Sequence, residues 1–162
     1  MLISLAKVAL NRNSKYKNGY FTPLYPEKYI GDVKNIIYRS GWEKTACKWF
    51  DGNPSILFWN SESLVIPYFY TLDNKIHNYH IDFVAKIRSR DGVVKTYVIE
   101  VKPEKETLMP TTKNKKRMLI EAQTYTKNQC KWKAAKAFCD ERGLIFIVLN
   151  EYDLGIKQRK SK

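Results

Sequence analysis

A short glycine-containing turn between two strand-like stretches constrains the fold of this chain more than any other feature. Residues 81–89 and 93–101 contain many β-branched and aromatic side chains, and Arg90-Asp91-Gly92 separates them. Stretches of this kind, joined by a few residues that include glycine, predict a β-hairpin. The hairpin carries Asp82 near the start of one strand and Glu100-Val101-Lys102 at the end of the other.

The length of the turn decides whether the charged side chains at the two strand ends share a face. Strand side chains alternate between the faces of a sheet, so Glu100 and Lys102 lie on the same face. If Asp91-Gly92 alone formed a two-residue turn, Asp82 would oppose Val101. The two carboxylates would then lie on opposite faces of the hairpin.

A three-residue turn, residues 90–92, gives a different register. Gly92 then adopts a positive φ and forms a bulge, and Ser89 pairs with Val93. In this register the aspartate opposes the glutamate directly. Glycine accepts a positive φ without steric cost, so we predict this second register.

Two carboxylates that face each other would favour a bound divalent cation. Like charges raise the pKa of both groups unless a cation lies between them, which applies here to Asp82 and Glu100. Oxygen ligands, without a Cys or His cluster at zinc spacing, favour Mg²⁺, for which Mn²⁺ would substitute. The metal would polarise a phosphodiester and acidify a bound water, and Lys102 would orient that water or stabilise the developing charge. The pattern fits phosphodiester hydrolysis.

A simpler interpretation of the same residues remains open. Asp82 and Glu100 would be solvent-facing residues of an ordinary hairpin, and Lys102 would be their cross-strand charge partner. The spacing alone does not decide between the two interpretations.

The composition predicts one folded, strongly basic domain. Hydrophobic residues make up 44% of the 162 residues, and 29 Lys and Arg against 16 Asp and Glu give a formal net charge of +13. A positive net charge of this size favours binding to nucleic acid or another polyanion. The same charges would alternatively keep the chain soluble or attract acidic protein surfaces. The basic residues cluster at Lys7, Arg12, Lys15 and Lys17, at Lys113, Lys115, Lys116 and Arg117, and at residues 157–162.

Cysteine usage and hydropathy indicate a soluble protein in a reducing compartment. Cys47, Cys130 and Cys139 form an odd set, and no secretory leader is recognisable, so we expect free thiols. The longest uninterrupted apolar run, residues 144–149, is too short to cross a membrane. We therefore expect no membrane partner.

The first half of the chain is expected to contain an arm, a helix and two strands. Residues 1–26 have the mixed character of an arm that packs on the body. Residues 27–50 predict a helix with a break at Ser40-Gly41. Residues 56–59 and 64–70 predict strands that precede the hairpin.

The second half predicts a loop, a long helix and a final strand. Residues 104–116 are expected to form an irregular basic loop. Residues 117–142 have helical spacing with a possible break near Asn128, and Gly143 suits a helix C-cap. Residues 144–149 predict a buried strand in a central position of a covered sheet.

The resulting order, helix, three strands, helix and strand, resembles the core of the PD-(D/E)xK restriction-endonuclease-like nucleases. The family's aspartate corresponds to Asp82, and its (D/E)xK corresponds to Glu100-Val101-Lys102, with His80 where many members have proline. The resemblance implies a mixed α/β (α+β) fold in which helices flank a mixed central sheet, in the order αβββαβ.

Three further segments resemble the head-completion proteins of T-even-like tailed phages. These are Arg39-Ser40-Gly41-Trp42-Glu43, the hairpin with Asp82, and residues 128–135. The chain also resembles the end-cutting endonuclease subunit of certain bacterial transposons. This resemblance covers most of the chain and implies a nuclease-like domain over 27–154, preceded by the arm of residues 1–26 and followed by a basic tail over 155–162.

The resemblance also implies an activity, a site and a place of action. The expected function is metal-dependent cleavage of packaged DNA at the head-to-tail joining stage, with phage portal or neck proteins as partners. The protein would act in the host cytoplasm and remain at the head–tail junction of the virion. The expected catalytic residues are Glu43, Asp82, Glu100 and Lys102. The expected metal ligands are Asp82, Glu100, Glu43 and the backbone carbonyl of Val101.

Some of these assignments have alternatives. Without the resemblance, Glu43 would be interpreted as an exposed carboxylate on a helix surface. Lys131 and Gln123 would either reach the scissile phosphate or be ordinary solvent-exposed residues on a helix. The residues expected to bind duplex DNA, largely without sequence preference, are Lys113, Lys115, Lys116, Arg117 and Lys131. The alternative function is a non-catalytic basic head-completion protein that uses a nuclease-like fold to bind DNA or the portal.

Overall fold

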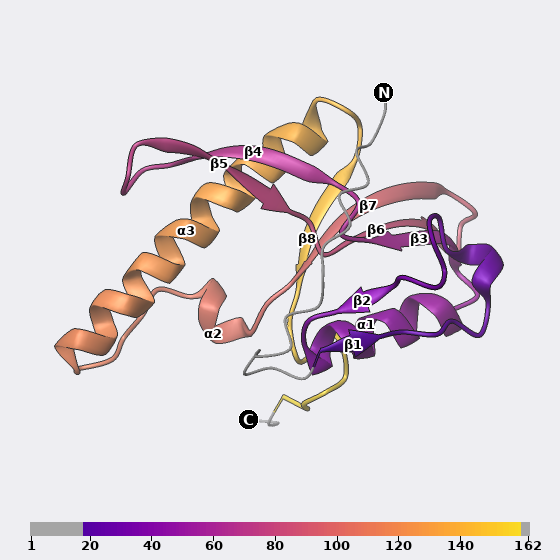
Figure 1. The fold of residues 1–162 in the computed structure, drawn as a ribbon, viewed down its shortest axis with the longest axis horizontal. Coiled ribbons are helices and arrows are strands. Elements are labelled where there is room, and N and C mark those ends of the chain that lie inside the picture. Colours follow the sequence, from indigo (N-terminus) through magenta and orange to yellow (C-terminus); the bar gives the residue numbers. More distant parts are fainter. Residues whose placement is uncertain (1–17, 160–162) are drawn as a thin grey trace.

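A mixed four-stranded sheet forms the centre of the computed structural model, which describes residues 18–159 (Figure 1). Its strands are β3 (Ile56–Ser61), β6 (Phe83–Arg88), β7 (Val94–Val101) and β8 (Ile145–Leu149), in the order β3-β6-β7-β8. β6 pairs antiparallel with both β3 and β7, and β8 pairs parallel with β7. A parallel pair needs a crossover connection, and the helical segment between β7 and β8 supplies it.

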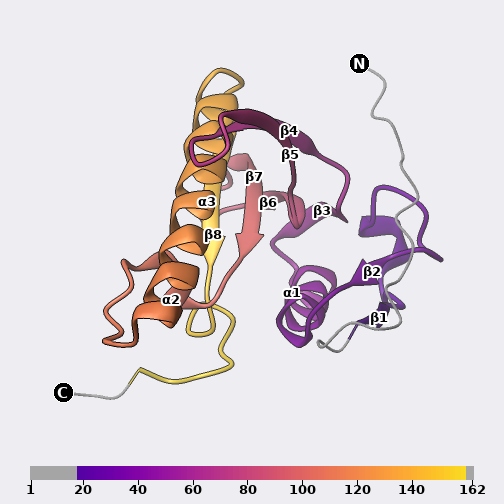
Figure 2. The same cartoon turned by 60° about the vertical axis from the view of Figure 1, so that its left-hand side comes forward.

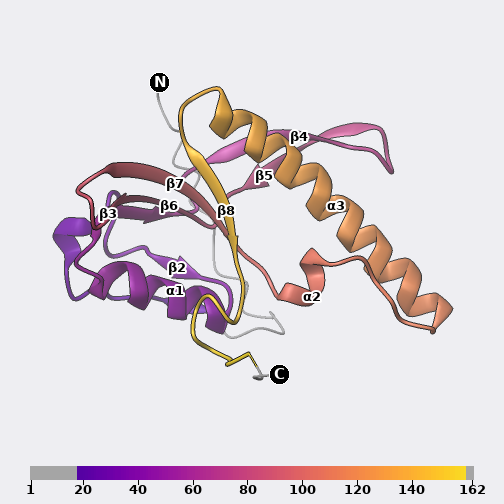
Figure 3. The same ribbon diagram turned by 180° about the vertical axis from the view of Figure 1, so that it is seen from behind.

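Helices cover both faces of this sheet (Figures 2 and 3). α1 (Gly41–Gly52) lies on one face, and α3 (Lys115–Asp140) lies on the other. The short helix α2 (Glu104–Thr107) connects β7 to α3. The mixed α/β fold with a mixed central sheet is therefore confirmed.

Each face of the sheet has its own apolar core. The core on the α1 side joins that helix to the inward side chains of β3, β6 and β7, and includes Phe50, Trp59, Phe83 and Ile99. The core on the α3 side includes Tyr68, Tyr79, Val98, Ala135 and Cys139. Neighbouring residues of β7 alternate between the two cores, as a strand that is covered on both faces requires.

A separate hairpin interrupts the predicted three-strand meander. Within residues 18–159, β4 (Val65–Tyr70) and β5 (Lys75–His80) pair only with each other, over six residue pairs, and the hairpin lies against α3. The prediction of a strand over 64–70 is confirmed, and this strand belongs to a two-stranded sheet of its own. The meander consists of β3, β6 and β7, because the turn at Asn74, which has a positive φ of 55°, returns the chain along β4 instead.

The helix predicted over residues 27–50 begins much later. Only 41–52 are α-helical, whereas Pro26–Lys28 form a 3₁₀ turn and β2 (Ile37–Tyr38) pairs with β1 (Gly19–Tyr20). The Asp51 carboxylate accepts the backbone N–H groups of Leu24 and Tyr25, which ties this non-helical segment to the end of α1.

Two predictions in the second half also need correction. α3 is continuous through Asn128, whose buried side chain donates to the carbonyl oxygen of Glu106 instead of breaking the helix. β8 is half-buried and lies at the edge of the sheet, not at its centre, because it pairs with β7 alone within the described residues. Gly143 has a positive φ of 64° after the helix end, as predicted.

The termini limit what can be said of the predicted arm and tail. Residues 1–17, with Lys7, Arg12, Lys15 and Lys17, and residues 160–162 lie outside the described part of the chain. Between residues 18 and 159, no helix has both the length and the apolar character needed to cross a membrane.

Candidate active site

The site lies where the chain leaves the β4–β5 hairpin and enters the central sheet. Phe83 pairs with Ile99, and the Ser89 N–H donates to the Val93 carbonyl oxygen at 2.9 Å. Gly92 between them has a φ of 83°. The three-residue turn and its register are confirmed, so Asp82, directly before β6, comes opposite the end of β7.

Asp82 and Glu100 are brought together by this register. The Asp82 Oδ2 atom accepts the backbone N–H of Val101 at 2.8 Å. Glu100 is 2% exposed, and its two oxygens have different partners. The Tyr79 hydroxyl donates to Oε2 at 2.9 Å, and Lys102 Nζ lies 3.1 Å from Oε1.

The electrostatics of this pair are those of an incompletely neutralised negative site. Burial raises the pKa of Asp82 well above its usual range, and the charges of Glu100 and Glu43 raise it further. Burial alone would lower the pKa of Lys102, but Glu100 and Asp82 outweigh this effect and raise it. Lys102 is therefore a cation at neutral pH, and Asp82 still favours an additional positive charge.

Glu43 reaches the same region from the first turn of α1. Its Oε2 atom accepts the Arg39 N–H at 2.7 Å, and its Oε1 atom accepts the Ser40 hydroxyl at 2.9 Å. Ser40 in turn accepts the Glu43 N–H, so the two residues form a cap closely related to a capping box. Burial raises the pKa of Glu43, against these hydrogen bonds. Glu43 is thus a half-buried capping group beside the site, not the exposed carboxylate of the alternative interpretation.

A cavity of about 580 Å³ joins the start of α1 to the end of β7. Arg39, Trp42 and Glu43 line it on one side, and Val101 and Lys102 line it on the other. Arg39 is also ion-paired with Glu62. The cavity is large enough for a phosphodiester group and places two cationic side chains around it.

The donor set fits a hard divalent cation. Asp82, Glu100 and Glu43 offer carboxylate oxygens, and the backbone of Val101 lies next to both strand-end carboxylates. Within residues 18–159, no three His, Cys, Asp or Glu side chains converge as a preformed metal-binding cluster. Mg²⁺ is commonly bound by one or two carboxylates and keeps several water ligands.

The residues expected to bind DNA fall into two separate places. Lys131 lies on the sheet-facing part of α3, with Nζ 5.0 Å from the centre of the Tyr79 ring. Burial lowers the pKa of Lys131, and the charge of Glu100 partly offsets this. Lys113, Lys115, Lys116 and Arg117 are exposed at the start of α3, which extends away from the sheet (Figure 1). At 1.5 Å per helical residue, Lys116 is about 20 Å along the helix from Lys131.

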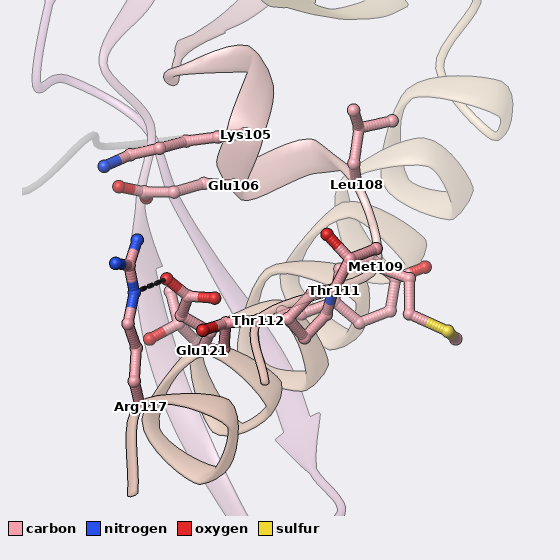
Figure 4. Close-up of a pocket in the computed structure, with 11 residues that line it drawn as sticks. Lys105, Glu106, Leu108, Met109, Thr111, Thr112, Arg117 and Glu121 are labelled. Atoms are coloured by element: carbon pink, nitrogen blue, oxygen red, sulfur yellow. Dashed lines mark hydrogen bonds and ion pairs between the residues drawn. The ribbon is translucent and has the colours of Figure 1, made fainter. Parts of the chain in front are cut away.

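A second cavity of about 380 Å³ opens beside this basic segment (Figure 4). It lies between the loop that follows α2 and the first turns of α3. Arg117 faces into it and donates through Nε to Glu121 Oε1 at 2.8 Å. Among the four basic residues of the segment, Arg117 is therefore already ion-paired.

Sequence reasoning missed Tyr79, which contacts Glu100 directly. No motif marks it, and the sequence of residues 75–80 does not single it out, because the apolar Ile76 lies on the opposite face of the strand and is exposed. Its proximity to Glu100 depends on how the β4–β5 hairpin crosses the central sheet, which local patterning does not specify.

Comparisons with known proteins agree with this geometry. The family model for the N-terminal domain of TnsA-like endonucleases matches residues 53–151, which include Asp82, Glu100, Lys102 and Lys131 but not Glu43. The head completion nuclease of Enterobacteria phage T4 is 41% identical over 140 residues, which is 83% of this chain and 91% of that protein.

Proposed function

This chain belongs to the family of TnsA-like endonucleases, within the restriction-endonuclease-like nucleases, and we propose that it hydrolyses phosphodiester bonds in phage DNA with a bound Mg²⁺ ion. The observation that carries the proposal is the pair of carboxylates, Asp82 and Glu100, held across a hairpin with Lys102 beside them. A raised pKa at Asp82 is the expected property of a group that has to be neutralised by a cation.

The metal ligands in this proposal are Asp82, Glu100 and the backbone carbonyl of Val101, with Glu43 assisting. When bound, the ion would polarise the phosphodiester and lower the pKa of an attacking water, and Mn²⁺ would substitute for Mg²⁺. The protein supplies orientation. Its backbone N–H at Val101 fixes the Asp82 carboxylate, and burial excludes bulk water from the Glu100 side chain.

Lys102 has the second chemical role. Its ammonium group stays protonated because Glu100 and Asp82 raise its pKa, so it acts as a donor and not as a base. It would orient the attacking water or stabilise the charge that develops on the phosphate oxygens. Its position in the cavity beside Arg39 supports this role.

The DNA contacts would run along α3. Lys131 is close enough to the carboxylates to meet the scissile region, and Lys113, Lys115, Lys116 and Arg117 would hold the backbone about six base pairs away. Contacts of this kind to phosphates fix the position of a duplex but do not read its sequence.

The place of action follows from the relative. The T4 protein is a head completion nuclease, and we infer that this chain acts on packaged DNA at the same late stage. It would work in the host cytoplasm during assembly, contact portal or neck proteins, and remain at the head–tail junction. The nuclease domain would span residues 27–154, flanked by the arm of residues 1–26 and the tail of residues 155–162.

The test is cleavage of supercoiled and linear DNA by the full chain with Mg²⁺, with Mn²⁺ and with a chelator. We expect metal-dependent cutting that Glu100→Gln reduces at least about 100-fold, because the substitution keeps the side-chain shape but removes a ligand charge. Glu141→Gln is the matched control, since this carboxylate is 72% exposed and lies at the far end of α3.

Two results would contradict the proposal. Cutting that persists in the Glu100→Gln variant would place the active site elsewhere. If the protein binds DNA in a salt-sensitive way but does not cut it with Mg²⁺ or with Mn²⁺, the alternative of a non-catalytic head-completion protein would be favoured. Nicked circles compared with shortened linear fragments would separate endonuclease from exonuclease action.

A further inference from the structure

Tyr79 joins the β4–β5 hairpin to the carboxylate site. It belongs to β5, which has no pairing with the central sheet, yet its hydroxyl donates to Glu100 Oε2 at 2.9 Å. The side chain is only 1% exposed. A residue of the inserted hairpin therefore determines the surroundings of a carboxylate on β7.

The Tyr79 ring is held on several sides. It pairs across the hairpin with Ile66, which is also buried, and its ring meets that of Tyr68 edge-on at 6.4 Å. Lys131 Nζ of α3 lies 5.0 Å from the ring centre. The hydroxyl consequently has little freedom to leave Glu100 without disturbing the packing between the hairpin and α3.

The hydroxyl also needs its acceptor. Burying a hydroxyl without a hydrogen bond is unfavourable, whereas phenylalanine would fill the same apolar space without that cost. A tyrosine at this position is therefore best explained by its bond to Glu100. The bond fixes Oε2, while Oε1 is the atom that faces Lys102 at 3.1 Å.

We propose that Tyr79 is a positioning residue that holds the Glu100 carboxylate in the orientation required for metal binding. The inference rests on the proposed function, because it assigns Tyr79 to the same metal site. Groups that hydrogen-bond to metal ligands restrict their orientation, and loss of such a group typically weakens metal binding or activity by about 10- to 100-fold. Because Tyr79 belongs to the β4–β5 hairpin, Glu100 is oriented correctly only when this hairpin packs on α3.

The experiment compares Mn²⁺ binding by the full chain in four forms: wild type, Tyr79→Phe, Tyr68→Phe and Glu100→Gln. Calorimetry measures the affinity without DNA, and the Mn²⁺-induced rise in melting temperature gives a second measure at temperatures where each variant is folded. Tyr68→Phe is the matched control, because it removes a hydroxyl from the same buried face while the described bond to Glu100 stays intact.

We expect Tyr79→Phe to bind Mn²⁺ about 10- to 100-fold more weakly than the wild type, and Tyr68→Phe to bind like the wild type. The rise in melting temperature on adding Mn²⁺ should likewise be smaller for Tyr79→Phe than for the wild type, and unchanged for Tyr68→Phe. A purely structural role for Tyr79 would lower the melting temperature in chelator without changing the Mn²⁺ affinity of the folded protein.

The outcomes separate the inference from the function on which it rests. If wild type binds Mn²⁺, Glu100→Gln does not, and Tyr79→Phe binds like the wild type, the role of Tyr79 is disproved while the metal site stands. If Tyr68→Phe weakens binding as much as Tyr79→Phe, the effect belongs to hairpin packing and the role of the hydroxyl is disproved. If the wild type itself fails to bind Mn²⁺, both the metal site and the positioning role are disproved.

Discussion

Asp82 makes the metal-free protein less stable than it would be with a neutral side chain. Burial and the nearby Glu100 and Glu43 charges raise its pKa, so ionisation of this carboxylate opposes folding. The Val101 N–H and Lys102 compensate only in part. The proposed metal binding and the stability of the metal-free protein therefore make opposite demands on this residue.

Asp82→Asn should raise the melting temperature of the metal-free protein at neutral pH while abolishing cleavage. The amide oxygen can still accept the Val101 N–H, but the repulsive charge is gone. Below the unfolded pKa of about 3.9, the wild-type carboxyl is protonated in both states and the gain is small. As the pH rises through the raised pKa that Asp82 has in the folded state, the wild type loses stability. The stability advantage of Asp82→Asn therefore grows and then levels off.

Urea unfolding in chelator, from pH 4 to pH 8, measures the difference in unfolding free energy between Asp82→Asn and the wild type. Added Mn²⁺ should make this difference smaller, because only the wild type gains a bound cation. Asp91→Asn is the control, since this exposed turn carboxylate has its pKa lowered by the Ser89 hydroxyl and the Val93 N–H. Equal stability of Asp82→Asn and wild type across the range would show that the Asp82 charge is already balanced.

Glu43 has two possible contributions, as a helix cap and as a metal ligand, and matched variants separate them. Ser40→Ala removes the hydroxyl that caps α1 and should cost about 1 kcal/mol of stability, with cleavage by the folded protein retained. Glu43→Gln keeps an acceptor for the Arg39 N–H and should cost little stability but reduce metal-dependent cleavage.

Chemical denaturation and cleavage rates at a temperature where both variants are folded provide the comparison. A stable Glu43→Gln variant with wild-type cleavage would restrict Glu43 to capping. The match of the endonuclease family model begins after this residue, so the measurement also tests whether the site extends beyond residues 53–151.

At the level of elements, α3 consists of two halves with different surroundings. Its first turns contain no buried side chain, and Leu119 and Ile120 are 61% and 55% exposed. Asn128, Ala135 and Cys139 are buried farther along. A helical segment of about a dozen residues is only marginally stable without packing.

Hydrogen exchange should therefore differ along α3. Amides of residues 119–124 should exchange through local opening, with opening free energies near zero, whereas those around Ala135 should approach the stability of the whole domain. Exchange mass spectrometry of the full chain at low protein concentration measures both segments together. Uniform protection along the helix would contradict the expectation and would mean that another surface covers Leu119 and Ile120.

The elements that the sequence predicted correctly are those fixed by local chemistry. The 90–92 turn set the hairpin register through Gly92, and Gly143 marked the end of the long helix. The central position expected for residues 144–149 was wrong, because a run of apolar residues does not distinguish an edge strand, which pairs on one side, from a central strand, which pairs on both.

The candidate site was predictable to the same extent. Asp82, Glu100 and Lys102 lie on a single hairpin, so alternation and register were enough to bring them together. Tyr79 depends on a tertiary contact between two sheets, and Lys131 depends on how α3 lies against them. Neither contact has a counterpart in local sequence spacing.

Across the whole molecule, the net charge of +13 is unevenly available for DNA. Arg159 and Lys157 of the tail pair with Glu104 and Glu151 near α2, and Arg117 pairs with Glu121. Lys115 and Lys116 are exposed in the first turn of α3. Figure 3 shows that this end of α3 extends beyond α2, away from the central sheet. These two lysines are therefore better placed for phosphate contact than the total charge alone indicates.

Replacing Lys115 and Lys116 with alanine should reduce the salt dependence of DNA binding. Each phosphate contact contributes about 0.9 to the slope of log affinity against log salt, so the double variant should lower the slope by about 1.8 if both lysines contact the duplex. Binding should weaken equally for unrelated sequences, because phosphate contacts carry no base information. Fluorescence anisotropy with short duplexes in chelator measures the slope without cleavage.

Lys86→Ala with Lys95→Ala provides a control with the same charge change. Both lysines are exposed toward the turn of the β6–β7 hairpin, roughly 15 Å along the strands from the end that carries Asp82 and Glu100. If the two double variants reduced the slope equally, DNA would respond to net charge and not to a path along α3. A reduction confined to Lys115 and Lys116 would support a duplex that lies along α3 toward the carboxylates.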